Sequence, residues 1–221
     1  MRILSWNLLH TGGATLGDVL GLIERQRPDL LLLQEATAAI DGLAKIGGTY
    51  HRSLMPGRAN GLAAWSAQGF RLLDTLNLPP GLAWDLRPLR SRPGRSRIAL
   101  VLEFQAIQIA NVHLDHGQRS NRRQLRHIAE TYPGIGLIMG DFNAVGAARP
   151  HGFSDIGPRR ITHMARGVVP FRLDRCLSRT LVPMTATALP YGPSDHRPIV
   201  IDFPPCADPA IVKDLALGVS S

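Results

Sequence analysis

The chain has 221 residues, of which 44% are hydrophobic and 19% charged, and a formal net charge of +8. This length and composition indicate one large globular domain and exclude an intrinsically disordered chain. No apolar run approaches membrane-spanning length, and the N-terminal segment lacks the cleavage site of a signal peptide. We therefore expect a cytoplasmic protein without membrane contact, and a monomer.

The positive charge comes from arginine, since lysine occurs only at Lys45 and Lys213. An arginine-rich surface attracts polyanions, and phosphate esters such as nucleic acid are the first candidates. A GC-rich genome would produce the same bias, so the charge alone leaves a nucleic-acid partner open. Cys176 and Cys206 form no metal motif and are expected to be reduced core residues.

Strand-forming segments recur along the chain and are interrupted by few helices. In chain order the predicted strands are 2–8, 30–35, 60–66, 70–76, 96–104, 107–115, 136–141, 171–178, 181–189 and 197–203. Hairpins are predicted around Gln68-Gly69 and around Gln105-Ala106. Helices are predicted at 16–27, where Thr15 can cap the first turn, and at 118–132.

Many strands with helices at intervals predict an α/β sandwich, in which two largely antiparallel sheets pack face to face with helices outside. The domain is expected to cover residues 1–203, with a tail at 204–221 that includes a short amphipathic helix. Two segments rich in proline, glycine and arginine, 77–96 and roughly 145–170, are expected to be loops.

Polar side chains of the types that handle metal ions and phosphate stand at or near the ends of several predicted strands. A carboxylate buried in an apolar strand is costly unless it is paired or bound to a metal. Each position alone has an ordinary alternative as a cap, a turn or a structural ion pair, but their joint occurrence favours one shared site. These residues are Asn7, Glu35, Asn111, His113, Asp141, Asn143, Asp174, Asp195 and His196.

Six motifs occur in a characteristic order between residues 3 and 200: SWNLL, LLLQE, NVHLDHG, GDFNA, RLDRCL and SDHRPI. On these motifs the chain resembles the endonuclease/exonuclease/phosphatase (DNase I-like) family of metal-dependent phosphoesterases. Each motif alone is weak, but GDFN together with a downstream SDH before an apolar strand is specific. The resemblance implies a four-layered α/β sandwich, which agrees with the strand and helix pattern.

The resemblance also implies a magnesium site, at which Mn²⁺ could replace Mg²⁺. Glu35 corresponds to the main metal ligand of the family, and Asn7 lies beside the metal. A hard cation with few protein ligands suits a phosphate substrate, because a phosphate oxygen completes its coordination shell.

His196 corresponds to the family's general base, which activates a water molecule. Neighbouring side chains on a strand point to opposite faces, so Asp195 is badly placed to orient His196. Asp174 is expected to orient His196 instead, as the matching aspartate does in the family. Asp195 then faces the metal side as a ligand, either directly or through water.

The remaining motif positions are expected to handle the phosphate. Asp141 and Asn143 match the pair that positions the phosphate and the attacking or leaving oxygen, and His113 matches a residue that stabilises the transition state. Arg97 and Asn111 are candidates for binding substrate. Leu9 stands where abasic-site endonucleases of the family often have aspartate, which weakens that interpretation.

The sequence therefore predicts a Mg²⁺-dependent hydrolase of phosphodiester bonds, with nucleic acid as the favoured substrate and either endonuclease or exonuclease action. A phosphomonoesterase or a lipid or inositol-phosphate phosphoesterase of the same family is the alternative. A catalytically silent nucleic-acid-binding relative ranks last, because all the motif positions are filled.

Overall fold

The computed structural model describes residues 1–81 and 96–204. Its helices are α1 (Leu16–Gln26), the 3-10 helix η1 (Ala38–Ile46) and α2 (Gln118–Thr131). One sheet consists of β1 (Arg2–Asn7), β2 (Leu30–Ala36), β3 (Thr49–Leu54), β4 (Gly61–Ser66), β13 (Thr185–Ala188) and β14 (Ile199–Asp202). The other consists of β5 (Arg71–Leu78), β6 (Arg97–Phe104), β7 (Ile107–His113), β8 (Ile135–Asp141), β9 (Ser154–Asp155) and β12 (Asp174–Ser178).

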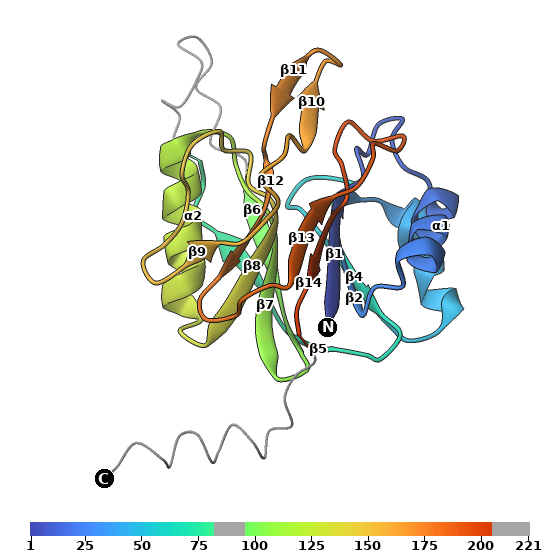
Figure 1. Cartoon of the computed structure of the whole chain (residues 1–221), viewed down its shortest axis with the longest axis horizontal. Coiled ribbons are helices and arrows are strands. Elements are labelled where there is room, and N and C mark those ends of the chain that lie inside the picture. Colours follow the sequence, from blue (N-terminus) through green and yellow to red (C-terminus); the bar gives the residue numbers. More distant parts are fainter. Residues whose placement is uncertain (82–95, 205–221) are drawn as a thin grey trace.

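The sheets form the two inner layers of a four-layered sandwich. The first has the strand order β13-β14-β1-β2-β4-β3 and the second the order β5-β6-β7-β8-β12-β9. Helix α1 covers the outer face of the first sheet and α2 that of the second (Figure 1). A separate hairpin of β10 (His163–Ala165) and β11 (Val169–Phe171) projects at one end. The predicted α/β sandwich is confirmed.

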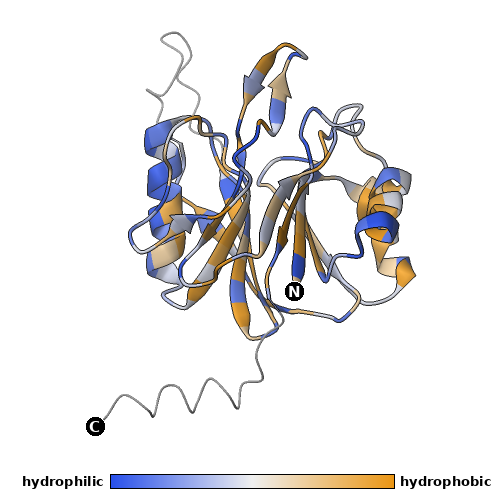
Figure 2. Cartoon of the chain, viewed as in Figure 1, coloured by the Kyte–Doolittle hydropathy of each residue, from blue (hydrophilic) through white to orange (hydrophobic). Residues whose placement is uncertain are grey.

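Three apolar clusters hold these layers together. The first fills the space between the sheets and includes Ile3, Leu32, Leu100 and Cys176. The second lies under α2 and the third under α1 and η1. The outer face of α2 is polar (Figure 2). Such continuous burial of apolar area is the main driving force for folding.

Local sequence signals account for several element boundaries. Helix α1 begins with a capping box, in which the Thr15 hydroxyl accepts from the Asp18 amide and the Asp18 carboxylate accepts from the Thr15 amide. The hairpin between β6 and β7 turns at Gln105 and Ala106, both in the left-handed region that tight hairpin turns require. The predictions of both helices and of this hairpin are confirmed.

The hairpin expected around Gln68-Gly69 is wrong. Strand β4 is buried along its whole length and pairs with β2 on one side and β3 on the other. Neither edge of β4 is left for β5, so the chain crosses to the other sheet and β5 pairs with β6. Strand propensity identified both segments but carried no information about their partners.

The expected loops, the C-terminal helix and the two cysteines have different outcomes. The segment 145–170 is mostly irregular, as expected, but it contains β9 and β10 and the start of β11. The C-terminal helix expected within 204–221, most of the loop 77–96 and Cys206 lie outside the described residues. Cys176 is buried and free, as expected. In the part that is described, no helix is long and apolar enough to cross a membrane.

Strand direction brings the predicted site residues to one edge of the sandwich. Among the described strands, β1 and β2 are the parallel pair of the first sheet and β7 and β8 that of the second. Asn7 at the end of β1 bonds to Asp141 at the end of β8, so all four strands end at the same edge. Strand β12 runs antiparallel to β8, and β14 antiparallel to β1, so both begin there. The polar ends of strands from both sheets therefore meet.

Candidate active site

Asp141, the last residue of β8, is the centre of this polar edge. The register places it opposite His113 of β7 on one side and opposite Asp174 of β12 on the other. Its carboxylate accepts hydrogen bonds from the Asn7 side chain at 2.9 Å and from the Asn143 backbone amide at 2.9 Å. Both inner sheets thus contribute donors to one buried carboxylate.

The local backbone at Asn143 supports this arrangement. Asn143 adopts a left-handed conformation with φ of 48°, which asparagine tolerates better than most residues. In this conformation its side-chain amide donates to the Leu114 carbonyl at 3.1 Å and to the Asp141 carboxylate at 3.3 Å. The GDFN motif therefore forms an Asx-type turn that also fixes the orientation of its aspartate.

His196 lies in the loop before β14 and contacts carboxylates through both ring nitrogens. Its Nδ1 is 2.9 Å from Asp174 Oδ2, and its Nε2 is 3.8 Å from Asp141 Oδ2. The backbone of this loop is fixed by Ser194, whose hydroxyl donates to the Asn7 carbonyl and accepts from the His196 amide. The ring is therefore held in one orientation, with Asp174 on the side away from Nε2.

Burial and neighbouring charge shift the pKa values of these groups in opposite directions. Burial disfavours protonated His196, but Asp174 and Asp141 outweigh burial and raise its pKa to about 10. Burial also disfavours ionised Asp141, but His196 and His113 outweigh it and lower the pKa to about 2. Burial, reinforced by Arg97, lowers the pKa of His113 well below its ordinary value. His113 is therefore a neutral imidazole beside ionised Asp141.

Glu35 lies at an irregularity near the end of β2. Gln34 pairs with Leu62 and Ala36 with Gly61, so Glu35 is the extra residue of a β-bulge, and its φ is 56°. Its Oε2 accepts from the backbone amide of His10 at 2.9 Å and also contacts the His10 ring. Burial disfavours its ionised form, but His113 and His10 outweigh burial and lower its pKa.

The donor set at this edge fits a hard divalent cation. His113 Nε2 lies 4.0 Å from Glu35 Oε1 and 3.5 Å from Asp141 Oδ2, so two carboxylates of low pKa converge on one imidazole. The ligand atoms of Asp141, Asp174 and His196 also lie within 4.8 Å of one another. Oxygen-rich sets of this kind suit Mg²⁺ or Mn²⁺ rather than softer ions.

The family model of the endonuclease/exonuclease/phosphatase family matches residues 4–196 of this chain. The chain belongs to the endonuclease/exonuclease/phosphatase family. It is therefore a hydrolase that acts on phosphoester bonds, in a family that depends on divalent metal ions. No curated protein matches the chain.

Solved structures of other family members share the fold. A humanised D. rerio TDP2 has a TM-score of 0.67 at 17% identity, with 91% of this chain and 97% of that chain covered. D. rerio TDP2 in complex with a single-strand DNA product has a TM-score of 0.65 at 17% identity, with coverage of 91% and 97%. The catalytic domain of human Nocturnin with bound sulfate has a TM-score of 0.58 at 22% identity, with 92% of both chains covered.

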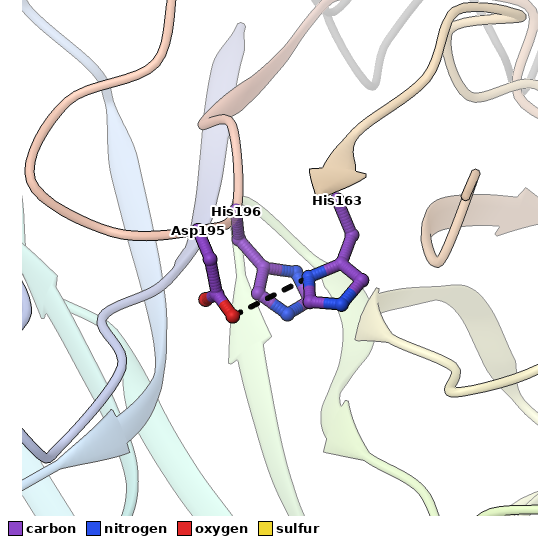
Figure 3. A group of neighbouring side chains, drawn as sticks. All are labelled: His163, Asp195 and His196. Carbon is purple, nitrogen blue, oxygen red and sulfur yellow. Dashed lines mark ion pairs between the residues drawn. The ribbon is translucent and has the colours of Figure 1, made fainter. Parts of the chain in front are cut away.

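Asp195 does not contact Glu35 in this family member. Among the described residues its ion pair is with His163 of β10, whose Nδ1 lies 3.7 Å from Asp195 Oδ2 (Figure 3). The His163 ring in turn packs on the His196 ring, with 4.2 Å between centroids. Asp195 lies in a bend, and His196 forms an isolated antiparallel bridge with His163 rather than belonging to a strand, so strand alternation is not what separates their side chains.

Asn111 and Arg97 occupy different environments. Asn111 is fully buried between the sheets, where its amide nitrogen donates to the carbonyls of Leu33 and Ala63 and its oxygen accepts from Gln34. Its predicted substrate contact therefore has no support from the structure. Arg97 is also buried, but its Nε and Nη1 have no hydrogen-bond partner among the described residues. Its nearest carboxylate in the described part of the chain is Asp115, at 4.0 Å from Nε.

Sequence reasoning missed His10 and His163. His10 follows β1 in a loop and contacts Glu35, and His163 lies in the segment expected to be an irregular loop. Neither belongs to a motif that carried the family resemblance. A histidine near a predicted strand was the available signal, and it is too common to single out a residue.

Proposed function

We propose that the chain is a phosphodiesterase of nucleic acid that uses Mg²⁺, or Mn²⁺ in its place, and His196 as general base. The observation that carries this proposal is the 2.9 Å contact between His196 Nδ1 and Asp174 Oδ2 in a buried setting. In the neutral form of the ring, that contact favours the tautomer with the proton on Nδ1. Nε2 is then the basic nitrogen and faces the polar edge of the sandwich.

His196 would take a proton from a water molecule through Nε2, while Asp174 holds the ring and stabilises the imidazolium that forms. A carboxylate in this position can contribute to catalysis without itself taking the proton. His113 supports the same reaction from the opposite side. As a neutral imidazole it can donate one N–H to a phosphate oxygen as negative charge grows there.

Glu35 is the proposed main metal ligand, with the Asn7 amide beside it. When bound there, a divalent cation supplies Lewis-acid stabilisation to the phosphate and a positive charge that favours the neutral, basic form of His196. We assign Asp195 an outer role through water, because its Oδ2 faces His163 while its buried Oδ1 has no hydrogen-bond partner among the described residues.

The phosphate side is assigned to Asp141, Asn143 and Arg97. Asp141 and Asn143 are tied together by hydrogen bonds and would position the phosphate and the attacking or leaving oxygen. Arg97 is a buried cation whose Nε and Nη1 have no partner within residues 1–81 and 96–204, and a phosphate oxygen would supply the missing acceptor. Its burial, reinforced by Arg58, lowers its pKa to about 10, so it stays charged at neutral pH.

Nucleic acid is the proposed substrate class for two reasons, the positive charge of the chain and its similarity to a structure that contains DNA. The net charge of +8 favours association with a polyanion. The structure of D. rerio TDP2 with a single-strand DNA product also supports a nucleic-acid substrate for a protein of this fold.

The test is a hydrolysis assay with Mg²⁺ on plasmid DNA, abasic duplex, single-stranded DNA, RNA, a chromogenic phosphodiester and inositol phosphates. His196→Ala should lose activity by about 10²-fold or more, the usual contribution of a general base. His151→Ala, which changes an exposed histidine outside the site, is the matched control and should retain activity.

Three results would contradict parts of the proposal. Turnover that persists in excess EDTA would contradict the requirement for a metal ion. Full activity of His196→Ala would contradict its role as general base. Hydrolysis of monoesters or inositol phosphates without cleavage of any nucleic acid would instead support the alternative substrate class. Cleavage products of a 5′-labelled and a 3′-labelled strand then distinguish internal from terminal attack.

A further inference from the structure

A cavity of about 520 Å³ lies beside β12 and β9, at one edge of the second sheet. Its walls come from the loop 145–149, from β9 and the loop after it, and from the start of β12. Its charged lining consists of Arg149, Arg159, Arg172, Arg175 and one acid, Asp155. Four guanidinium groups therefore face a single carboxylate.

The cavity and the catalytic residues lie on opposite sides of β12. Alternate residues of a strand point to opposite faces of the sheet. Asp174 contacts His196 and Cys176 packs between the two sheets, so both point inward. Arg175 lines the cavity and Leu177 packs in the cluster under α2, so both point outward. The cavity is thus a second polar region, distinct from the site described above.

The Asp155 carboxylate holds the Arg172 and Arg175 side chains in place but cannot neutralise the charge of all four arginines. Its two oxygens accept from Arg172 at 2.7 and 2.8 Å in a bidentate pair, and Oδ1 also accepts from the Gly157 amide. Arg175 Nη1 lies 3.5 Å from the same carboxylate. One negative charge, already fully hydrogen-bonded, therefore stands against four positive charges.

Arg175 carries the clearest sign of a missing partner. Only 5% of the residue is exposed, and its Nε has no hydrogen-bond partner among the described residues. Its Nη2 donates to the carbonyl of Ala144, which holds the guanidinium in place. Leaving a buried charged donor unpaired is costly, so an acceptor from outside the chain would stabilise this arrangement.

We propose that this cavity is an anion-binding site for a phosphate group. Arg172 and Arg175 form its fixed part, and the exposed side chains of Arg149 and Arg159 close on the bound group. The phosphate comes either from the chain of a nucleic-acid substrate, away from the bond that is cleaved, or from free phosphate. The first source rests on the proposed function, whereas the anion site itself does not.

The loop 143–149 connects the cavity with the catalytic edge. Asn143 bonds to Asp141, and two residues later Val145 lines the cavity. Arg172 lines the cavity two residues before Asp174. A strand of nucleic acid that leaves the catalytic edge along this loop would place a neighbouring phosphate against the arginines.

The test uses the full chain with Arg149→Gln/Arg159→Gln, which removes the two exposed charges and leaves the Asp155–Arg172 pair intact. The matched control is Arg123→Gln/Arg126→Gln, which removes the same charge from the exposed face of α2. Binding of a labelled single-stranded oligonucleotide is measured by anisotropy at several salt concentrations, in a His196→Ala background that prevents cleavage. Thermal unfolding is measured in parallel with inorganic phosphate.

We expect the cavity variant to bind the oligonucleotide at least about fivefold more weakly. The slope of log affinity against log salt should fall by about 0.7 for each phosphate group that the variant no longer neutralises. The control should change neither quantity. Loss of phosphate-induced thermal stabilisation in the cavity variant would identify free phosphate as a ligand. Weaker oligonucleotide binding without that loss would identify a phosphate of the nucleic-acid chain.

Unchanged binding of both probes by the cavity variant would overturn the proposal. Equal weakening in the control would also overturn it, because bulk charge would then explain the effect. A failed hydrolysis assay with intact, arginine-dependent anion binding would refute the proposed function and leave this site standing. In the catalytically intact chain, turnover of a small chromogenic diester should be the same for both variants.

Discussion

Asp174 Oδ2 lies 2.9 Å from His196 Nδ1, although Asp174 begins a strand of the second sheet and His196 precedes a strand of the first. The contact is buried, and Asp174 Oδ1 has no hydrogen-bond partner among the described residues. A carboxylate is costly to bury in this way unless it pairs with a cationic group. The pair therefore joins the two sheets at the point where the chemistry is proposed to occur.

Replacing Asp174 with asparagine should lower kcat by about 10²-fold or more, because the amide cannot hold His196 in the basic tautomer or stabilise its cation. KM should change little, since Asp174 does not contact the substrate in the proposed mechanism. The measurement is steady-state kinetics on a chromogenic diester together with a thermal melt. A loss of kcat matched by a collapse of the melting temperature would point to a structural role instead.

Replacing Glu35 with glutamine should weaken metal binding. Mg²⁺ at 100 times its Kd should stabilise the wild-type chain against unfolding by about 2.7 kcal/mol, and the same concentration should stabilise Glu35→Gln much less. Asp195→Asn provides the comparison and should retain most of the stabilisation, because its carboxylate faces His163. An equal loss in both variants would make Asp195 a direct ligand. The measurement is chemical unfolding with and without Mg²⁺.

Replacing Gly140 with alanine should destabilise the protein by at least about 2 kcal/mol. Gly140 has φ of 141°, and an added Cβ would lie 2.1 Å from the Val112 carbonyl oxygen. Gly17→Ala is the matched control, since Gly17 lies in α1 with only the Thr15 hydroxyl nearby, at 3.6 Å. That change should be neutral or stabilising by up to about 1 kcal/mol. Urea unfolding of both variants measures the difference.

Replacing Asp155 with asparagine should cost about 2–3 kcal/mol at pH 7, because Arg172 and Arg175 lose their buried counter-charge. Burial disfavours ionised Asp155, but Arg172 and Arg175 outweigh it and lower its pKa below the ordinary 3.8. This stabilisation is therefore fully present above pH 4 or so and is lost as the pH falls through the lowered pKa. The variant and wild type should converge in stability once the pH has fallen below this lowered pKa.

Unfolding of both proteins across this pH range checks the prediction, with Glu130→Gln on the exposed side of α2 as a control expected to stay within about 0.5 kcal/mol. A stability difference that persists unchanged at low pH would mean that packing, rather than charge, is what Asp155 contributes.

The fold was predictable where local chemistry decides it. The Thr15 capping box fixes where α1 begins, and the turn at Gln105-Ala106 forces its strands to pair. The pairing of β4 was not predictable in this way. Its partners, β2 and β3, are set by long-range burial, and a short turn at 67–70 serves a hairpin and a crossing between sheets equally well.

The site was predictable where a polar residue stands at or near the end of a buried strand, as Asp141 and Glu35 do. Side chains at strand ends on one edge of the sandwich lie close together. Their positions at strand ends in the sequence were therefore enough to assign them to one site. The environment of Asn111 was not predictable, because an amide can satisfy the backbone between two sheets as well as bind substrate. His163 reaches the site from a hairpin whose docking no local pattern encodes.

The division of the proposed site between the two sheets has a consequence for when a newly made chain becomes active. Asn7, Glu35 and His196 belong to one sheet and its flanking loop, and His113, Asp141 and Asp174 to the other. The first strand of the chain pairs with the last described strand, β14. If these six residues form the catalytic site as proposed, neither sheet contains it alone, and we expect a nascent chain to stay inactive until Asp202 has emerged from the ribosome. The onset of hydrolysis would then report completion of the native fold.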